Sequence, residues 1–201
     1  MAQEVFNGED PALFLYKILH RFTGISRAEF EPLIPYLQVR QFAKKQVILK
    51  AGEMEDYLSV VMHGLVRKFI VVDKKEITLQ LATEGHLVQS EVSFLTRTIS
   101  ELTVESIERC TLISMHIDDV QKALHEIPHA DELGRMIITY MFIKKDARTF
   151  TQLKKNTRER FLDYLTQNPH MLQRVPQKIL ASYLNIKPET FSRLKHLVSK
   201  K

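Results

Sequence analysis

Seven short apolar runs, separated by turn residues, occupy the chain from Gln38 to Ile117. They are rich in Val, Ile, Leu, Thr and Phe and lie at 39–42, 46–49, 57–63, 65–72, 77–82, 102–107 and 111–117. Many short strands with turn signals between them are typical of an antiparallel sandwich or barrel. Gly52, Gly64 and Gly85 fall between the runs, where a positive φ is often needed. The segment therefore predicts an antiparallel β domain.

Helical spacing appears on both sides of this segment. Residues 11–22 begin with Pro11, which suits the first turn of a helix. Residues 26–37 predict a second helix, because Ser26 and Glu29 form a capping box ahead of apolar residues at helical spacing. A third short helix is expected from Asp118 to Glu126, before Pro128.

A long helix is expected from Asp131, because the chain then has no proline and no glycine after Gly134 until residue 169. Apolar residues fall on successive a and d positions of a heptad pattern: Leu133, Met136, Tyr140, Ile143, Ala147 and Phe150. Ile137, Met141 and Phe142 widen this surface, so part of the helix is expected to lie on the β domain. Such a seam fits either an intramolecular core helix or a helix paired with its copy in a homodimer.

The basic charge is concentrated in the last quarter of the chain. Residues 1–153 hold 18 Lys and Arg against 21 Asp and Glu, a net charge of −3. Residues 154–201 hold 11 Lys and Arg against three acidic residues, a net charge of +8. This asymmetry points to an anionic partner for the tail or, more simply, to a solvated basic surface.

The basic tail has the pattern of a helix-turn-helix. A helix at 158–167 ends before Pro169, and a second begins at Pro176 or Gln177 and runs to about Leu184. Asn185 suits a left-handed turn, Ile186 can pack beneath it, and Pro188 suits the start of another helix. Phe191, Leu194 and Leu197 would form the buried face of that last helix, which could enter a major groove.

The polar residues of this tail suit contact with double-stranded DNA. Arg193 can bond bidentately to guanine and Glu189 can accept from cytosine, so these two are expected to read bases. Contacts with the DNA phosphate backbone are expected from Gln177, Lys178, Thr190, Ser192 and Lys195. Lys187 is a further candidate that could face a phosphate. Helical pairs also occur in protein-interaction modules, so a sensing or interaction module that does not bind DNA remains the alternative.

The order of these parts resembles the Crp/Fnr family of bacterial transcription regulators over nearly the whole chain. Residues 50–53 and 58–67 resemble the family's glycine-punctuated early β-roll, and residues 189–194 are similar to its recognition-helix motif. The tail from Asn168 looks like the branch found in Bacteroidetes. The resemblance implies an α+β fold: a cyclic-nucleotide-binding-like β-roll of jelly-roll type with flanking helices at 1–129, a long dimerisation helix at 130–153, and a winged helix-turn-helix domain at 154–201. It also implies a homodimer, with RNA polymerase as a further candidate partner.

The wing of the DNA-binding domain is expected to be reduced or absent, because only Ser199, Lys200 and Lys201 follow Val198.

The stretch matching the family's phosphate-binding residues departs from the pattern of cyclic AMP binders. Those members use a Gly-Glu pair and later an Arg-Ser or Arg-Thr pair, because an anionic phosphate needs a cation and several donors. The corresponding candidates here are Gln89, Ser90, Glu91, Ser100 and Glu101. Glu101 would repel a phosphate, and Arg97 is the nearby cation that could substitute. We expect no binding of cyclic AMP or cyclic GMP, and a pocket that is empty or holds another small effector.

Other cofactors and catalysis are not expected. Cys110 is the one cysteine, which excludes an iron–sulfur cluster and a disulfide framework. His63, His86 and His116 lie in or near the predicted roll, but a lone histidine is more often structural than a haem ligand. His125 and His129 have a metal-ligand spacing, which Pro128 interrupts. No Gly-rich phosphate loop, metal cluster or nucleophile motif is found, so the chain is not expected to be an enzyme.

The sequence also predicts a cytoplasmic location. No stretch approaches 18 uncharged apolar residues, which argues against a membrane span. The N-terminus lacks a basic region followed by an apolar core, so we expect no secretory signal.

Overall fold

The computed structural model describes the backbone of residues 9–198 and the side chains of residues 9–195, and it contains two antiparallel sheets. Their strand orders are β1-β7-β3 and β2-β6-β4-β5. The strands are β1 (Gln38–Phe42), β2 (Val47–Leu49), β3 (Tyr57–His63), β4 (Val66–Val72), β5 (Lys75–Ala82), β6 (Thr103–Ser106) and β7 (Cys110–His116). The predicted α+β fold with an antiparallel β domain is confirmed.

Strand β3 is apolar on both faces because both faces are covered. Val60 and Met62 point toward a cluster with the N-terminal helices, whereas Val61 points into the core between the two sheets. The strand ends at Gly64, whose φ is 93°. A Cβ there would lie 2.4 Å from the carbonyl oxygen of Arg109, so no other residue fits this close approach of two backbones.

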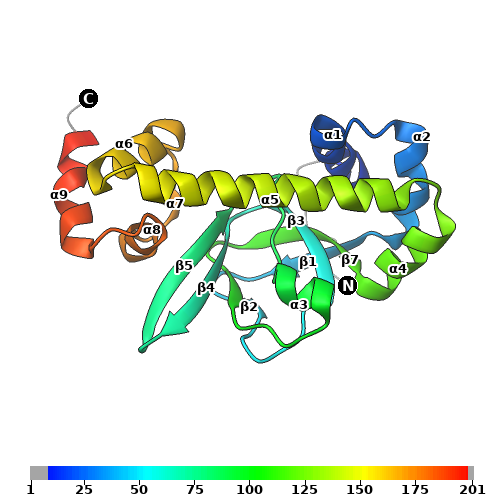
Figure 1. Cartoon of the computed structure of the whole chain (residues 1–201), viewed down its shortest axis with the longest axis horizontal. Helices are drawn as coiled ribbons and strands as arrows, with labels where there is room; N and C mark the ends of the chain where they lie inside the picture. The colour runs from blue at the N-terminus through cyan, green and yellow to red at the C-terminus, as the bar shows by residue number, and fades with distance from the viewer. Residues whose placement is uncertain (1–8, 199–201) are drawn as a thin grey trace.

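Helices lie along one side of the sheets and form the C-terminal end of the molecule (Figure 1). They are α1 (Pro11–Thr23), α2 (Arg27–Phe30), the 3-10 helix η1 (Glu31–Tyr36), α3 (Glu91–Thr96), α4 (Ile117–Glu126), α5 (Ala130–Lys154), α6 (Thr157–Gln167), α7 (Met171–Arg174), α8 (Gln177–Tyr183) and α9 (Pro188–Val198). None of the helices in the described ranges has the length and apolarity needed to cross a membrane.

The single helix predicted for residues 26–37 is wrong. Ser26 and Glu29 do form the expected capping box, but α2 ends at Phe30 and the chain continues as η1. Pro32 and Pro35 lack backbone N–H donors, and their rings crowd the preceding turn, so a regular α-helix cannot continue through them.

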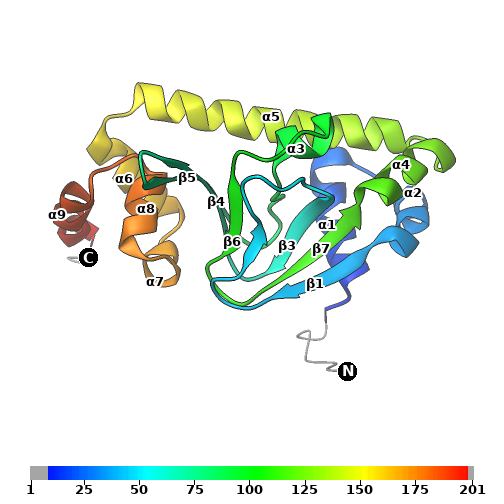
Figure 2. The same cartoon turned by 90° about the horizontal axis from the view of Figure 1, so that it is seen from below.

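The long helix α5 crosses the whole molecule and connects the β domain to the C-terminal helices (Figures 1 and 2). In its first half Ile137, Leu133 and Tyr140 pack on the cluster of α1 and β3, and Tyr140 stacks on Phe22 with ring centroids 4.4 Å apart. Met141 joins the same cluster, as expected. Phe142 does not, since it lies on the opposite face of the helix and is 68% exposed.

The C-terminal helices have a core of their own that continues onto the β domain. Phe161 of α6 and Phe191 of α9 meet edge to face, with ring centroids 5.1 Å apart. Ile186 is buried beside them, and Asn185 has a φ of 53°, so the predicted left-handed turn and its apolar plug are confirmed. The cluster also includes Leu65, Leu81 and Ile107, which belong to the β domain.

Candidate nucleic-acid interface and sensor pocket

Helix α9 presents a polar face at the end of the molecule. Phe191 is buried and Leu194 is partly buried, whereas Glu189, Ser192 and Arg193 are exposed. Thr190 and Lys195 are partly buried at the sides of this face. The side chains of His196 and Leu197, and residues 199–201 of the expected reduced wing, lie outside the described residues. Over this part of the helix, residues of the kind that read bases and residues of the kind that contact phosphates share one side.

The first turn of α8 and the turn before α9 add further polar side chains. Gln177 and Lys178 are exposed at the start of α8, and Lys187 is exposed immediately before Pro188. The carbonyl of Lys187 accepts the first helical hydrogen bond of α9, from the N–H of Phe191 at 2.9 Å. The structure thus brings the eight sequence-predicted residues onto two consecutive helices and the turn between them.

The C-terminal helices are held against the β domain by an ionic contact. Arg174 of α7 donates to Glu108 at 2.8 and 3.1 Å and to Glu84 at 3.0 and 3.1 Å. Burial alone would raise the pKa of Glu84, but the hydrogen bonds from Arg174 and from the N–H of Gly64 outweigh it and lower that pKa. The same pairing raises the pKa of Arg174. Arg174 is therefore a fixed cation between two segments of the β domain.

A cation–aromatic contact joins α5 to α8. The guanidinium of Arg148 lies 3.8 Å from the ring centroid of Tyr183 and donates to the carbonyl of Tyr183 at 2.9 Å. Arg160 of α6 donates to the carbonyls of Leu184 and Asn185, both at 3.1 Å. The C-terminal end of α8, where free carbonyls need donors, is thus capped by two arginines.

Among the sequence-predicted pocket residues, Ser90 and Ser100 are buried, and Ser90 immediately precedes α3. Their hydroxyls are 3.0 Å apart. The backbone N–H of Ser90 donates to a carboxylate oxygen of Glu55 at 3.1 Å, and the N–H of Tyr57 donates to the other oxygen at the same distance. Glu55 is only 7% exposed, and burial raises its pKa. An internal carboxylate therefore occupies the anion position at the start of α3.

Glu91 is paired with a buried lysine. The ammonium of Lys68 on β4 donates to Glu91 at 2.5 Å and to the carbonyl of Gln89 at 3.0 Å. Burial lowers the pKa of Lys68, and the nearby Glu91 carboxylate opposes that shift. The side-chain amide nitrogen of Gln89 contacts the sulfur of Met141 on α5. The side-chain amide oxygen of Gln89, Oε1, is buried and has no hydrogen-bond partner among the described residues. The charged and polar groups inside the β domain therefore pair with one another.

Arg97 is at the C-terminal end of α3 and contacts the backbone of Glu55, not its carboxylate. The Arg97 guanidinium donates to the carbonyl of Glu55 at 2.6 Å and to the carboxylate of Asp56 at 2.5 Å. Glu101 is exposed. The structure therefore brings Ser90, Glu91 and Ser100 together, and it places Arg97 and Glu101 outside them.

Sequence reasoning missed Glu55, Lys68 and Ser93 as members of this network. Ser93 accepts from the N–H of Glu55 at 2.9 Å. Glu55 precedes β3 and Ser90 caps α3, so 35 residues separate the two partners. A buried charge inside an apolar strand, such as Lys68 in β4, was the one local signal that could have pointed to the site.

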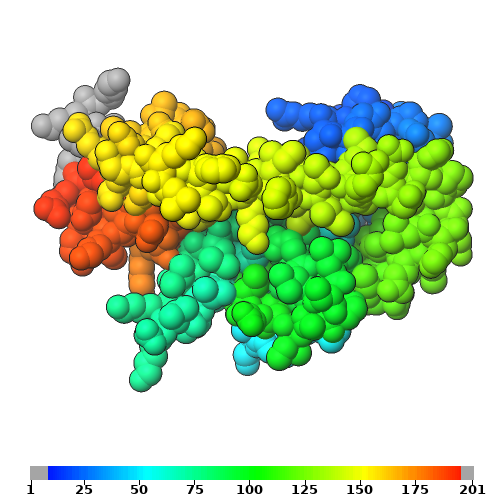
Figure 3. All heavy atoms as spheres, viewed as in Figure 1, coloured from blue at the N-terminus to red at the C-terminus, as the bar shows by residue number. Residues whose placement is uncertain are grey.

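Helix α5 lies uncovered on the face of the molecule that Figure 3 shows. Five large apolar side chains form an exposed stripe along this helix, of which Leu153 is 78% exposed: Ile138, Phe142, Ile143, Phe150 and Leu153. Ile143, Ala147 and Phe150 of the predicted heptad seam are exposed, whereas Leu133 and Tyr140 are packed within the chain and Met136 lines a surface pocket. The first half of the seam is therefore packed within the chain, whereas its second half is exposed.

The described residues contain no group of three or more His, Cys, Asp or Glu side chains that could hold a metal ion. Cys110 is a free, buried thiol, and burial raises its pKa to about 11. A thiol with so high a pKa is a poor nucleophile at neutral pH.

Comparisons with known proteins identify the β domain and the overall fold. Residues 39–126 match the model of the cyclic nucleotide-binding domain. A comparison with curated proteins finds no significant match.

Among solved structures, the chain is similar to the catabolite activator protein of Thermus thermophilus, with 20% identity, a TM-score of 0.56 and coverage of 91% of this chain and 87% of that one. It is also similar to CLP, described as a c-di-GMP-responsive global regulator of Xanthomonas campestris, with 16% identity, a TM-score of 0.65 and coverage of 87% and 93%. FixK2 of Bradyrhizobium japonicum gives 17% identity, a TM-score of 0.64 and coverage of 82% and 85%. Residues 39–126 therefore match a cyclic nucleotide-binding domain, and the chain shares its overall fold with these three structures.

Proposed function

We propose that this protein is a homodimeric, sequence-specific DNA-binding transcription regulator of the Crp/Fnr type that does not respond to cyclic AMP or cyclic GMP. In this proposal α9 reads the major groove, α5 pairs with its copy, and the protein is cytoplasmic and not an enzyme. RNA polymerase as a partner and the Bacteroidetes branch stay predictions from the sequence.

The exposed polar face of α9 is the observation that carries the proposal. Glu189, Ser192 and Arg193 lie together on a helix whose opposite side is anchored by buried Phe191. The preceding helix offers exposed Lys178 at its start, where free backbone N–H groups favour a phosphate. The net charge of +8 over residues 154–201 supplies the attraction to an anionic duplex.

The uncovered stripe on α5 supports a dimer. Exposed apolar residues on ordinary protein surfaces are scattered singly, whereas five lie along this one helix. They are Ile138, Phe142, Ile143, Phe150 and Leu153. Pairing two such helices about a two-fold axis would bury the stripe and present two α9 helices to half-sites about 34 Å apart.

The network around Glu55 supports the lack of response to cyclic nucleotides. The donors at the start of α3 already bind the carboxylate of Glu55, and Lys68 is already neutralised by Glu91. A cyclic nucleotide phosphate would have to displace these contacts and lie beside two carboxylates. Calorimetric titration with cyclic AMP and cyclic GMP tests this point, and micromolar affinity for either would overturn it.

Selection from a pool of random duplexes tests DNA binding. We expect enrichment of a two-fold symmetric site, and an affinity for it that falls steeply as salt rises from 50 to 200 mM. Retention of the same affinity at both salt concentrations, or no enriched sequence, would favour the sensing or interaction module instead.

A further inference from the structure

An apolar cavity lies between the β1-β7-β3 sheet and the helices that cover it. Its volume is about 100 Å³, and it is separate from the network around Glu55. Its walls come from α1, β3, β7, α4 and the first turns of α5, and include Leu15, Val60, Ile113, Ala123, Leu133 and Ile137. The cavity therefore lies between the sheet and the start of α5.

The chemistry of the walls excludes a bound water. Ser114 is the one polar side chain among the lining residues, and its hydroxyl already bonds the hydroxyl of Ser59 at 2.9 Å. A buried water needs two to four polar partners, whereas an apolar cavity stays dry or takes an apolar guest. An apolar cavity of about 150 Å³ takes benzene, so this smaller cavity suits a hydrocarbon group of about four carbon atoms.

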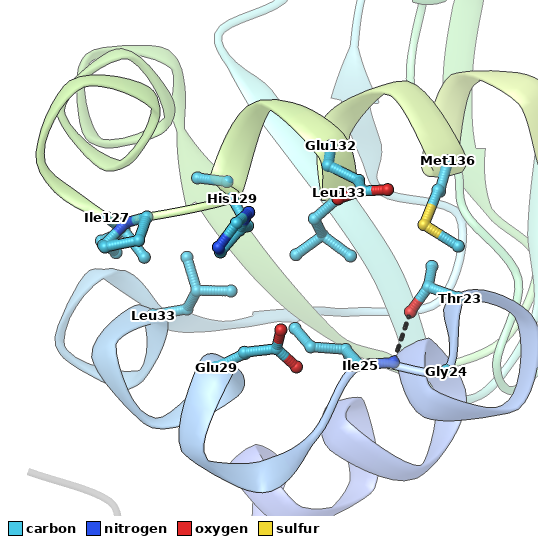
Figure 4. A pocket seen from close by; sticks show the side chains of 12 residues that line it. Thr23, Gly24, Ile25, Glu29, Leu33, Ile127, His129, Glu132, Leu133 and Met136 are labelled. Carbon is cyan, nitrogen blue, oxygen red and sulfur yellow. Dashed lines mark hydrogen bonds between the residues drawn. The ribbon is translucent and has the colours of Figure 1, made fainter.

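A wider surface pocket adjoins the cavity. It has a volume of about 240 Å³ and shares Leu33, Ala130 and Leu133 with the apolar cavity as wall residues. Figure 4 shows Glu29 and Leu33 facing His129 and Leu133 across this pocket. The two hollows are therefore neighbours that share one wall.

The charges of the outer pocket select among head groups. Glu29 and Glu132 both line it and are exposed. Hydrogen bonds from the side chain and the backbone N–H of Ser26 lower the pKa of Glu29, so its carboxylate is charged at neutral pH. Glu132 pairs with Arg135 at 3.3 Å and His129 lines the same pocket, so the carboxylate of Glu29 is the group that disfavours an anionic head group relative to a neutral or cationic one.

We propose that the two neighbouring hollows open into one another and bind a small amphiphile with a neutral or cationic head group and a hydrocarbon tail of about six carbons, of which about four lie in the apolar cavity. The tail lies between Val60, Ile113 and Ile137, and the head lies near Glu29 and Glu132. The site is independent of the proposed DNA binding, because the walls belong to the β domain, its covering helices and the start of α5.

Thermal unfolding of the full chain without DNA tests the proposal, with 1-hexanol, hexylamine and hexanoate as probes. We expect 1-hexanol and hexylamine to raise the unfolding midpoint by about 3–5 °C at ten times their dissociation constants. Hexanoate should give a smaller shift at every concentration. Equal shifts from hexylamine and hexanoate, or no shift from any probe, would overturn the proposal.

Two variants locate the site. Ala123→Leu adds bulk to the cavity wall and should abolish the 1-hexanol shift, whereas Ala28→Leu on the exposed side of α2 should leave it intact. Leu19→Ala enlarges the same cavity and should raise the affinity for 1-octanol relative to 1-hexanol, whereas Leu165→Ala in the C-terminal core should not. If Ala123→Leu fails to fold, an unchanged octanol preference in Leu19→Ala is sufficient to reject the site.

Discussion

The hydroxyl of Ser182 on α8 accepts a hydrogen bond from the backbone N–H of Thr78 on β5 at 2.9 Å. It also donates to the carbonyl of Glu76 at 3.1 Å. Strand β5 is at the edge of its sheet, so these two backbone groups have no neighbouring strand there. One side chain of α8 therefore takes the place of a strand partner and fixes this helix to the β domain.

Replacement of Ser182 by Ala should destabilise the protein by about 1–3 kcal/mol, because the N–H of nearly buried Thr78 would lose its partner. Urea unfolding measures the difference. Thr166→Ala, at an exposed position of α6, is the control and should change stability by less than about 0.5 kcal/mol. An equal effect of both variants would mean that the contact with β5 contributes nothing.

Arg174→Ala should cost about 1–2 kcal/mol, because it removes charge-assisted hydrogen bonds to Glu84 and Glu108 that are only partly screened by water. The pKa of Glu84 is lowered in the folded state, so its contribution is complete above the ordinary carboxyl pKa of 4.5 and is lost as the pH falls through the lowered value. The difference in unfolding free energy between wild type and variant should therefore shrink in acid. A difference that stays constant from pH 7 to pH 3 would contradict this assignment.

Glu55→Ala should destabilise the β domain by about 1–3 kcal/mol, because the N–H groups of Ser90 and Tyr57 would lose their acceptor. Glu55→Gln keeps an acceptor oxygen and should cost less. Burial raises the pKa of Glu55, so the folded state binds this proton more readily than the unfolded state. The unfolding free energy of wild type should consequently rise relative to that of Glu55→Gln as the pH falls below the raised pKa. A fall in this difference on acidification would contradict a raised pKa of Glu55 in the folded state.

The sequence predicted the strands well because each is a short apolar run closed by a turn. The turn between β4 and β5 is an example, since Asp73 and Lys74 both have a positive φ and make the two-residue connection that hairpins favour. Helix α3 was missed because its six residues have no room for a helical period. The pairing of Glu55 with Ser90 could not be predicted either, because it depends on how the chain folds back over 35 residues.

Phe142→Glu should weaken self-association without unfolding the chain. Phe142 is 68% exposed, so its replacement removes little of the internal packing. In the proposed dimer, however, the apolar stripe on α5 is the interface, and a carboxylate at residue 142 would be buried there. Sedimentation measures the change in the dimer dissociation constant, which we expect to rise at least tenfold, equivalent to about 1.4 kcal/mol. Val71→Glu, at an equally exposed apolar position near the β4–β5 turn, should leave association unchanged.

Arg193→Ala should remove discrimination between DNA sequences, at about 1–3 kcal/mol, if its guanidinium reads a guanine. Among the side chains of residues 9–195, this guanidinium has a 3.5 Å contact with the hydroxyl of Thr190, so little bonding with them must be broken for it to reach a base. Lys178→Ala is the matched control at the start of α8. It should weaken all sequences alike and reduce the slope of affinity against salt by about one, because it removes a phosphate contact. Competition between the selected site and a scrambled duplex separates the two outcomes: an unchanged preference in Arg193→Ala would exclude this residue from base reading.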